Sequence, residues 1–131
     1  MDISVVFATY DRLEILKKTL NGFKRLVDDN IKWELVVVDN ACLDQTKDLV
    51  QSYRDILPIT YLREPNQGKN NALITGVAAT SAPLIILTDD DIIPDHNWLH
   101  EVVAGASRWP QHSFFGGKIL PTFPEGISPP P

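Results

Sequence analysis

Apolar and polar positions along the chain follow two periods in turn, which predicts alternating strands and helices. Apolar, β-branched runs typical of buried strands occur at residues 3–8 (ISVVFA), 33–39 (WELVVVD), 58–64 (PITYLRE) and 83–88 (PLIILT). Between and after these runs, apolar residues recur every three or four positions, the spacing of an amphipathic helix. The helical stretches cover residues 13–27, 49–53, 66–80 and 95–109. We expect a fifth strand at residues 113–120 (SFFGGKIL).

This order of elements indicates the fold class. Strand and helix alternate four times with short connections, which favours right-handed crossovers in a parallel sheet. We therefore predict an α/β domain: a doubly wound, mostly parallel, Rossmann-like sheet with helices on both faces. Small residues at Ala72, Gly76 and Ala79 would let the third helix lie close to the sheet. Residues 121–131 hold five prolines, and we interpret them as a tail or linker.

Composition and charge exclude several function classes. The chain has 131 residues, which suits one domain, and a net charge of -5, which disfavours nucleic-acid phosphates as a partner. Its one cysteine, Cys42, excludes an intrachain disulfide and favours a reducing compartment. No apolar run reaches membrane-spanning length. We expect a cytoplasmic protein whose membrane association, if it has any, lies in parts outside this chain.

Polar residues follow every predicted strand. In open α/β sheets the ligand crevice lies beyond the carboxyl ends of the strands, so these residues are the candidates for a binding site. In strand order they are Thr9, Tyr10 and Asp11; Asp39 and Asn40; Asn66, Gln67, Gly68 and Lys69; and Asp89, Asp90 and Asp91.

Three consecutive aspartates, Asp89, Asp90 and Asp91, repel one another unless something compensates their charge. In an extended stretch Asp89 and Asp91 point to the same side and Asp90 points away. Two converging carboxylates share a proton or hold a hard cation. Because Mg²⁺ and Mn²⁺ take one or two carboxylates together with phosphate oxygens, the D-x-D pattern predicts a metal-held diphosphate. A solvated acidic turn is the alternative.

Three other residues complete the candidate site. Asp39 can accept hydrogen bonds from a ribose hydroxyl or a base N–H. Lys69, behind a glycine at a helix start, favours an anion. Tyr10 can stack on a base or pack as an ordinary aromatic residue.

Competing families with acidic sites fit the sequence less well. A nicotinamide dehydrogenase needs a glycine-rich turn after the first strand, and ATYDRLE contains no glycine. A receiver domain needs its acidic pair after strand one and its phosphorylated aspartate after strand three. An Asp-nucleophile phosphatase places D-x-D after its first strand, whereas here the motif follows strand four. The remaining interpretation is a metal-held nucleotide diphosphate.

The sequence resembles the N-terminal half of the family 2 inverting glycosyltransferases, which have the glycosyltransferase A fold. The matching stretches span nearly the whole chain in the family's order: VVFATYDR, ELVVVDNACLDQT, REPNQGKNNALITG, LTDDDIIPDHNWL and FFGGKILP.

The resemblance implies a role for each candidate residue. Thr9, Tyr10 and Asp39 would bind the nucleobase, most often uracil, and Lys69 would lie near the base or diphosphate. Asp89 would meet the ribose or help to hold the metal, and Asp91 would ligate Mn²⁺ or Mg²⁺. We add Asp90 to the predicted nucleotide-binding set.

The same resemblance implies transfer of a sugar from a nucleotide-diphospho-sugar, for which we expect a UDP-sugar, to a glycan or lipid-linked acceptor in polysaccharide biosynthesis. The family's general base comes from a second half, so we expect residues 1–120 to be a donor-binding domain incomplete at its C-terminus. Two alternatives stay open: a module that binds a nucleotide-sugar without transferring it, and a receiver-like signalling domain. Metal-dependent UDP binding separates the receiver from the other two.

Overall fold

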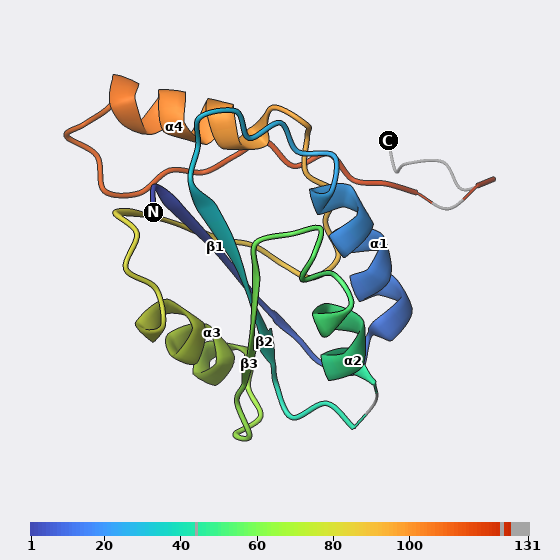
Figure 1. Ribbon diagram of the computed structural model, residues 1–131. Helices are drawn as coiled ribbons and strands as arrows, with labels where there is room; N and C mark the ends of the chain where they lie inside the picture. Colours follow the sequence, from blue (N-terminus) through green and yellow to red (C-terminus); the bar gives the residue numbers. More distant parts are fainter. Residues whose placement is uncertain (44, 124, 127–131) are drawn as a thin grey trace.

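The chain forms a parallel sheet flanked by helices in the computed structural model (Figure 1). The structure describes residues 1–43, 45–123 and 125–126. Over these residues the elements follow in the order β1 (Ile3–Thr9), α1 (Leu13–Phe23), β2 (Trp33–Asp39), α2 (Thr46–Gln51), β3 (Ile59–Arg63), α3 (Lys69–Ala78), β4 (Leu84–Leu87) and α4 (Trp98–Arg108). The bounds of β2 are those predicted, whereas α1 ends and α4 begins inside the predicted helices.

The strand order of the sheet is β3-β2-β1-β4, and each neighbouring pair is parallel. The chain therefore adds β2 and β3 on one side of β1 and then places β4 on the other side, so the strand order reverses at the β1/β4 pair. This confirms the predicted doubly wound arrangement. The register places Thr9 opposite Asp39, and Asp39 opposite Arg63. Because Val6 is opposite Leu87, the residues that follow β4 lie beside the last residues of β1.

Alternate residues of the central strands supply two hydrophobic clusters, one on each face of the sheet. The larger cluster joins β1 and β2 to α1, α2 and α4, and its members include Val5, Phe7, Leu16, Leu20, Phe23, Leu35, Val37, Val50 and Leu99. Phe23 is central there: its ring stacks on Phe7 and Trp33 and meets Trp98 edge-on. The smaller cluster joins Val6, Val36 and Val38 to Ala72 of α3. Figure 1 shows α3 on the opposite side of the sheet from α1 and α2.

Helix α3 lies close to the sheet because small residues face it. Ala72 and Gly76 are buried, as predicted, whereas Ala79 is exposed. A Cβ atom added at Gly76 would lie 2.5 Å from Val6 Cγ1 and 2.9 Å from Val38 Cγ2. Only glycine therefore fits this position without a shift of the helix or the sheet.

The prediction of a fifth strand at residues 113–120 is wrong. This segment has no strand pairing in the structure, and Phe114 is 93% exposed. Topology gives a physical reason. A parallel strand on the free side of β4 would need a right-handed crossover with its helix on the α3 face, but Leu99 of α4 packs on the face of α1 and α2.

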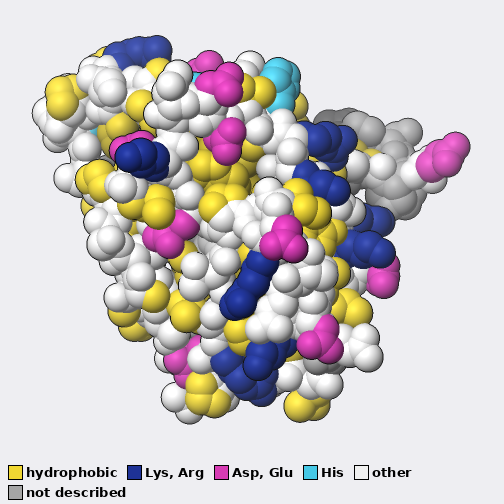
Figure 2. All heavy atoms as spheres, viewed as in Figure 1, with side chains coloured by type: hydrophobic (Ala, Val, Ile, Leu, Met, Phe, Trp, Pro, Cys, Tyr) yellow, Lys and Arg dark blue, Asp and Glu magenta, His cyan; other side chains and the backbone are white. Residues whose placement is uncertain are grey.

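The rest of the predicted tail forms neither helix nor strand where the structure describes it, at residues 121–123 and 125–126. Residues 124 and 127–131 lie outside the described residues. In the part of the chain that is described, no helix combines the length and apolar character needed to cross a membrane. Figure 2 shows acidic and basic side chains intermingled over one face of the molecule.

Candidate functional site

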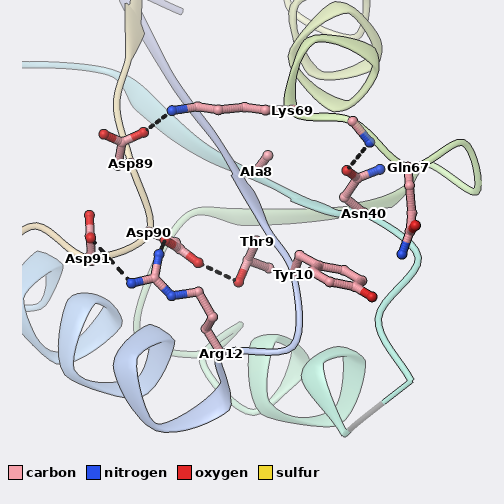
Figure 3. Close-up of a pocket in the computed structure, with 11 residues that line it drawn as sticks. Ala8, Thr9, Tyr10, Arg12, Asn40, Gln67, Lys69, Asp89, Asp90 and Asp91 are labelled. Atoms are coloured by element: carbon pink, nitrogen blue, oxygen red, sulfur yellow. Dashed lines mark hydrogen bonds and ion pairs between the residues drawn. The ribbon is translucent and has the colours of Figure 1, made fainter.

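A pocket of about 560 Å³ lies beyond the carboxyl ends of the strands, where the strand order reverses between β1 and β4. This is the position at which open α/β sheets bind ligands. Its lining residues come from four segments: Ala8, Thr9, Tyr10 and Arg12 at the end of β1 and just after it; Asn40 after β2; Gln67, Gly68 and Lys69 at the start of α3; and Asp89, Asp90 and Asp91 after β4 (Figure 3).

Asp90 is the buried member of the three aspartates. Thr9 Oγ1 donates a hydrogen bond to Asp90 Oδ2 at 2.9 Å, and Arg12 Nη1 lies 2.8 Å from Oδ1. Thr19 of α1 donates from Oγ1 to the Asp90 backbone carbonyl at 2.6 Å. The residue that the sequence suggested as a nucleotide contact thus has protein partners on its carboxylate and its carbonyl.

The two flanking aspartates are half-exposed and each meets a basic side chain. Arg12 Nη2 lies 3.3 Å from Asp91 Oδ2, and Lys69 Nζ forms an ion pair with Asp89 Oδ1. In Figure 3 these two cations approach the acidic loop from opposite sides of the pocket. Adjacent carboxylates repel by about 1 kcal/mol in water and about 4 kcal/mol near a protein surface, and the two cations offset this repulsion.

Burial dominates the electrostatics of Asp90. It raises the pKa of the carboxyl above its usual value, and the charge of Asp91 adds to the rise. The hydrogen bond from Thr9 and the charge of Arg12 act in the opposite direction without cancelling the effect of burial.

Asp39 does not line the pocket in this structure. It is buried, its Oδ1 accepts from Cys42 N at 2.8 Å, and its Oδ2 accepts from Tyr61 Oη at 2.5 Å and from Arg63 Nη1 at 3.1 Å. Burial alone would raise the pKa of Asp39, but the bonds from Tyr61 and Cys42 and the charge of Arg63 hold it below the usual value. Burial and the bond to Asp39 raise the pKa of Tyr61 to about 12.

Asn40 organises the loop that carries Lys69. Its Nδ2 donates to the carbonyls of Glu64 at 3.2 Å and Asn66 at 2.9 Å, and its Oδ1 accepts from Gly68 N at 3.0 Å. Gly68 has a φ of 133°, a conformation that side-chain-bearing residues rarely adopt. The glycine that the sequence singled out is therefore needed to start α3 at the pocket.

The fold and the pocket agree with one known protein family. Residues 4–120 match the model of the family described as glycosyl transferase family 2. The chain belongs to glycosyl transferase family 2. Membership confirms the family resemblance seen in the sequence and excludes the receiver-like alternative.

Curated relatives of this family 2 chain are longer than the chain itself. Glycosyltransferase AglE from Haloferax volcanii is 29% identical over 127 residues, which cover 95% of this chain and 41% of AglE. The chain spans less than half the length of the curated relatives it matches.

Solved structures of similar fold include complexes with nucleotide sugars. TarS 1–349 from S. aureus, in complex with UDP-GlcNAc, aligns with a TM-score of 0.69 at 22% identity, covering 82% of this chain and 32% of TarS 1–349. The mannosyltransferase PcManGT from Pyrobaculum calidifontis, in complex with GDP-Man and Mn²⁺, aligns with a TM-score of 0.68 at 25% identity. The match covers 85% of this chain and 32% of PcManGT. Both share the parallel α/β fold of this chain.

The pocket of this family 2 chain offers oxygen ligands suited to a hard divalent cation. Asp89 and Asp91 are half-exposed and line the pocket. Over residues 1–43, 45–123 and 125–126, no group of three or more His, Cys, Asp or Glu side chains is arranged to hold a metal ion. Two carboxylates suit Mg²⁺ or Mn²⁺ only where phosphate oxygens and water supply the other ligands.

The sequence missed three charged or polar residues that shape the site. Arg12 follows Tyr10-Asp11 and precedes α1. No periodic pattern of the sequence marks this position. Tyr61 and Arg63 alternate at the end of β3, and only the parallel register brings them to Asp39. Of the predicted site residues, the structure gathers Thr9, Tyr10, Lys69, Asp89, Asp90 and Asp91 in one pocket and leaves Asp39 beside it.

Proposed function

We propose that this chain is the donor-binding part of a metal-dependent, inverting glycosyltransferase that uses a nucleotide-diphospho-sugar, with UDP as the nucleotide to test first. The observation that carries the proposal is the pocket itself. Two half-exposed carboxylates, Asp89 and Asp91, face a cavity at the β1/β4 reversal and have cations beside them. The complexes of TarS with UDP-GlcNAc and of PcManGT with GDP-Man and Mn²⁺ support it.

We divide the candidate residues between donor contact and support of the pocket. Tyr10 and Lys69 line the pocket with half-exposed side chains, so we assign them to the base and the diphosphate. The side-chain hydroxyl of Thr9 and the carboxylates of Asp39 and Asp90 already have protein partners. Thr9 and Asp90 therefore hold the wall of the pocket, and Asp39, beside the pocket, would reach a base once its contacts with Tyr61 and Arg63 opened.

Asp89 and Asp91 would hold Mn²⁺ or Mg²⁺, and a divalent ion bound there supplies positive charge to the leaving diphosphate. Lys69 is placed to add a further charge because it emerges from the first turn of α3, where a helix N-terminus also favours anions. Together these groups would let a chain of net charge -5 accept a diphosphate.

Transfer needs an acceptor and a general base in addition to the donor site. We propose that residues 1–120 form the nucleotide-sugar-binding domain and that an acceptor, a glycan or a lipid-linked sugar of polysaccharide biosynthesis, is positioned by other parts. On this proposal the chain alone binds donor and transfers little of it.

Calorimetric titration of UDP with and without Mn²⁺ tests the donor site. We expect binding that depends on Mn²⁺ and is lost in Asp91→Ala. Asp55→Ala, which removes an exposed carboxylate from the turn after α2, is the charge-matched control and should bind as the wild type does. Metal-independent binding, or equal binding by Asp91→Ala, would contradict the proposal.

A separate assay distinguishes a donor-binding part from a complete enzyme. Incubation of the chain with UDP-sugars and Mn²⁺ should release little free sugar and should glycosylate no added acceptor. Robust transfer by the 131-residue chain would show that the general base lies within it and would refute the division proposed above.

A further inference from the structure

The two terminal nitrogens of the Arg12 guanidinium meet carboxylates in different environments. Nη1 lies 2.8 Å from Oδ1 of Asp90, whose side chain is only 6% exposed. Nη2 lies 3.3 Å from Oδ2 of Asp91, whose side chain is 46% exposed. One arm of the fork is therefore anchored in the protein, and the other reaches an exposed partner at the pocket.

The contact to Asp90 is the one that the protein cannot easily give up. Only Asp90 of this pair is buried, so loss of Arg12 would leave the Asp90 carboxylate buried without its cation, which is unfavourable. Exposed ion pairs contribute little, because water solvates both partners when the pair opens. The Arg12–Asp91 contact is thus the replaceable half of the bridge.

We propose that Arg12 is a diphosphate-binding residue of this pocket, with Nη1 held on Asp90 while Nη2 exchanges Asp91 for a phosphate oxygen of the donor. This inference rests on the proposed function, since the exchange begins when Asp91 turns to a divalent cation. A guanidinium has donors in a fixed fork, so one nitrogen can keep its carboxylate while a second binds phosphate.

Lys69 lacks such an anchor. Its ion pair with Asp89 joins two half-exposed side chains, and its ammonium has no buried carboxylate among the contacts of the structure's described residues. Lys69 can follow the ligand, whereas Arg12 is held by Asp90, whose carboxylate also accepts a hydrogen bond from Thr9 (Figure 3). Arg12 therefore defines one side of the diphosphate position before the ligand arrives.

The exchange predicts that removing Nη2 changes the affinities for Mn²⁺ and for UDP in opposite directions. Without Nη2, Asp91 has lost a competing cation, so Mn²⁺ alone should bind more tightly. The same loss removes a charge-assisted bond to phosphate, so UDP should bind less tightly. A purely structural role would instead weaken both together.

Arg12→Lys and Arg12→Gln separate the fork from the charge. Arg12→Lys keeps a cation for Asp90 but has no second arm, because lysine offers a single ammonium. Arg12→Gln removes the charge as well. Arg54→Gln is the matched control, because it removes an exposed arginine that precedes β3, at the opposite end of the sheet from the pocket.

The experiment measures free Mn²⁺ by electron paramagnetic resonance without nucleotide, and UDP binding by calorimetry at saturating Mn²⁺. For Arg12→Lys we expect Mn²⁺ affinity to rise about twofold to fivefold. We expect its UDP affinity to fall about tenfold. Arg12→Gln should likewise raise the affinity for Mn²⁺ and lower the affinity for UDP. Arg54→Gln should change neither affinity. Thermal melting curves establish that each variant is folded. If Arg12→Gln has a lowered melting temperature, the test rests on Arg12→Lys alone.

The outcomes distinguish this inference from the function on which it rests. If the wild type shows no Mn²⁺-dependent UDP binding, the proposed function fails. If the wild type binds both ligands but the affinities of folded Arg12→Lys fall together or do not change, Arg12 is only structural and the exchange is refuted.

Discussion

Thr9 Oγ1 donates a hydrogen bond to Asp90 Oδ2 across 81 positions of sequence, and both residues are buried. The bond ties the carboxyl end of β1 to the loop that leaves β4, the two strands between which the sheet reverses. The half-exposed Asp89 and Asp91 lie on either side of this fixed point. The wall of the pocket is therefore held by a residue that the ligand need not touch.

Thr9→Val should destabilise the fold because valine has nearly the same shape but cannot donate to the buried carboxylate. We expect the free energy of unfolding to fall by about 1–3 kcal/mol, measured by urea denaturation. Thr9→Ser keeps the hydroxyl and should lose less. Equal stability of Thr9→Val and the wild type would show that the bond does not hold the loop.

Asp39→Asn should destabilise the protein at neutral pH and less so in acid. The pKa of Asp39 is lower in the folded protein than its ordinary value of 3.8. The folded state therefore binds fewer protons than the unfolded state in this range. The stability that the carboxylate contributes is complete above the ordinary pKa and is lost as the pH falls through the lowered value.

Urea denaturation of the wild type and Asp39→Asn measures this pH dependence of stability. The measurements run from about pH 3 to about pH 7, a range that spans the ordinary carboxyl pKa and extends above it. The difference between wild type and Asp39→Asn should narrow toward acid pH. Asp55→Asn makes the same charge change at an exposed site and serves as the control. A difference that stayed constant across the range would count against the role of Tyr61 and Arg63.

Gly76→Ala should destabilise the fold although alanine is the better helix former. Its Cβ would meet Val6 and Val38 of the sheet, so α3 must move away, at a net loss of about 1–3 kcal/mol. Gly105→Ala in α4 is the matched control, because a Cβ there has no neighbour within 4 Å. It should raise the free energy of unfolding by roughly 0.5–1 kcal/mol. Similar effects at both glycines would contradict the close contact.

Tyr10→Ala should weaken UDP binding in the presence of Mn²⁺, whereas Tyr10→Phe should retain most of it. The half-exposed ring of Tyr10 lines the pocket, and stacking of a base on an aromatic ring contributes about 1–3 kcal/mol. This corresponds to a loss of UDP affinity of about fivefold to 140-fold, measured by calorimetry. If both variants bind as the wild type does, the base lies elsewhere.

Much of the fold was predictable because the two central strands are apolar on both faces. The run WELVVVD has the predicted bounds, and its alternate residues enter opposite clusters, so the pattern implied helices on both sides. The segment SFFGGKIL shows the limit of such patterns. An apolar run predicts burial but not a partner strand, and the position of α4 denies this segment a right-handed path to β4.

The candidate site was predictable as a set of strand ends but not as a network. Parallel topology alone brings Thr9, Lys69 and the three aspartates together. Which carboxylate is buried depends on long-range contacts: a single arginine at position 12 carries no periodic signal, and it pairs with Asp90 from 78 positions away. For the same reason, the sequence around Asp39 could not predict that Tyr61 and Arg63 bind its carboxylate outside the pocket.

Trp98 stands at the start of α4, shortly after the acidic loop, and its indole meets the ring of Phe23 edge-on with centroids 6.1 Å apart. The loop is also tied to the segment that follows α1, since the backbone N–H of Val27 donates to the His96 carbonyl at 2.8 Å. A shift of this loop would therefore alter the surroundings of an indole that sits against an aromatic neighbour. The protein thus carries an intrinsic fluorophore positioned to register events at its acidic motif, with no label attached.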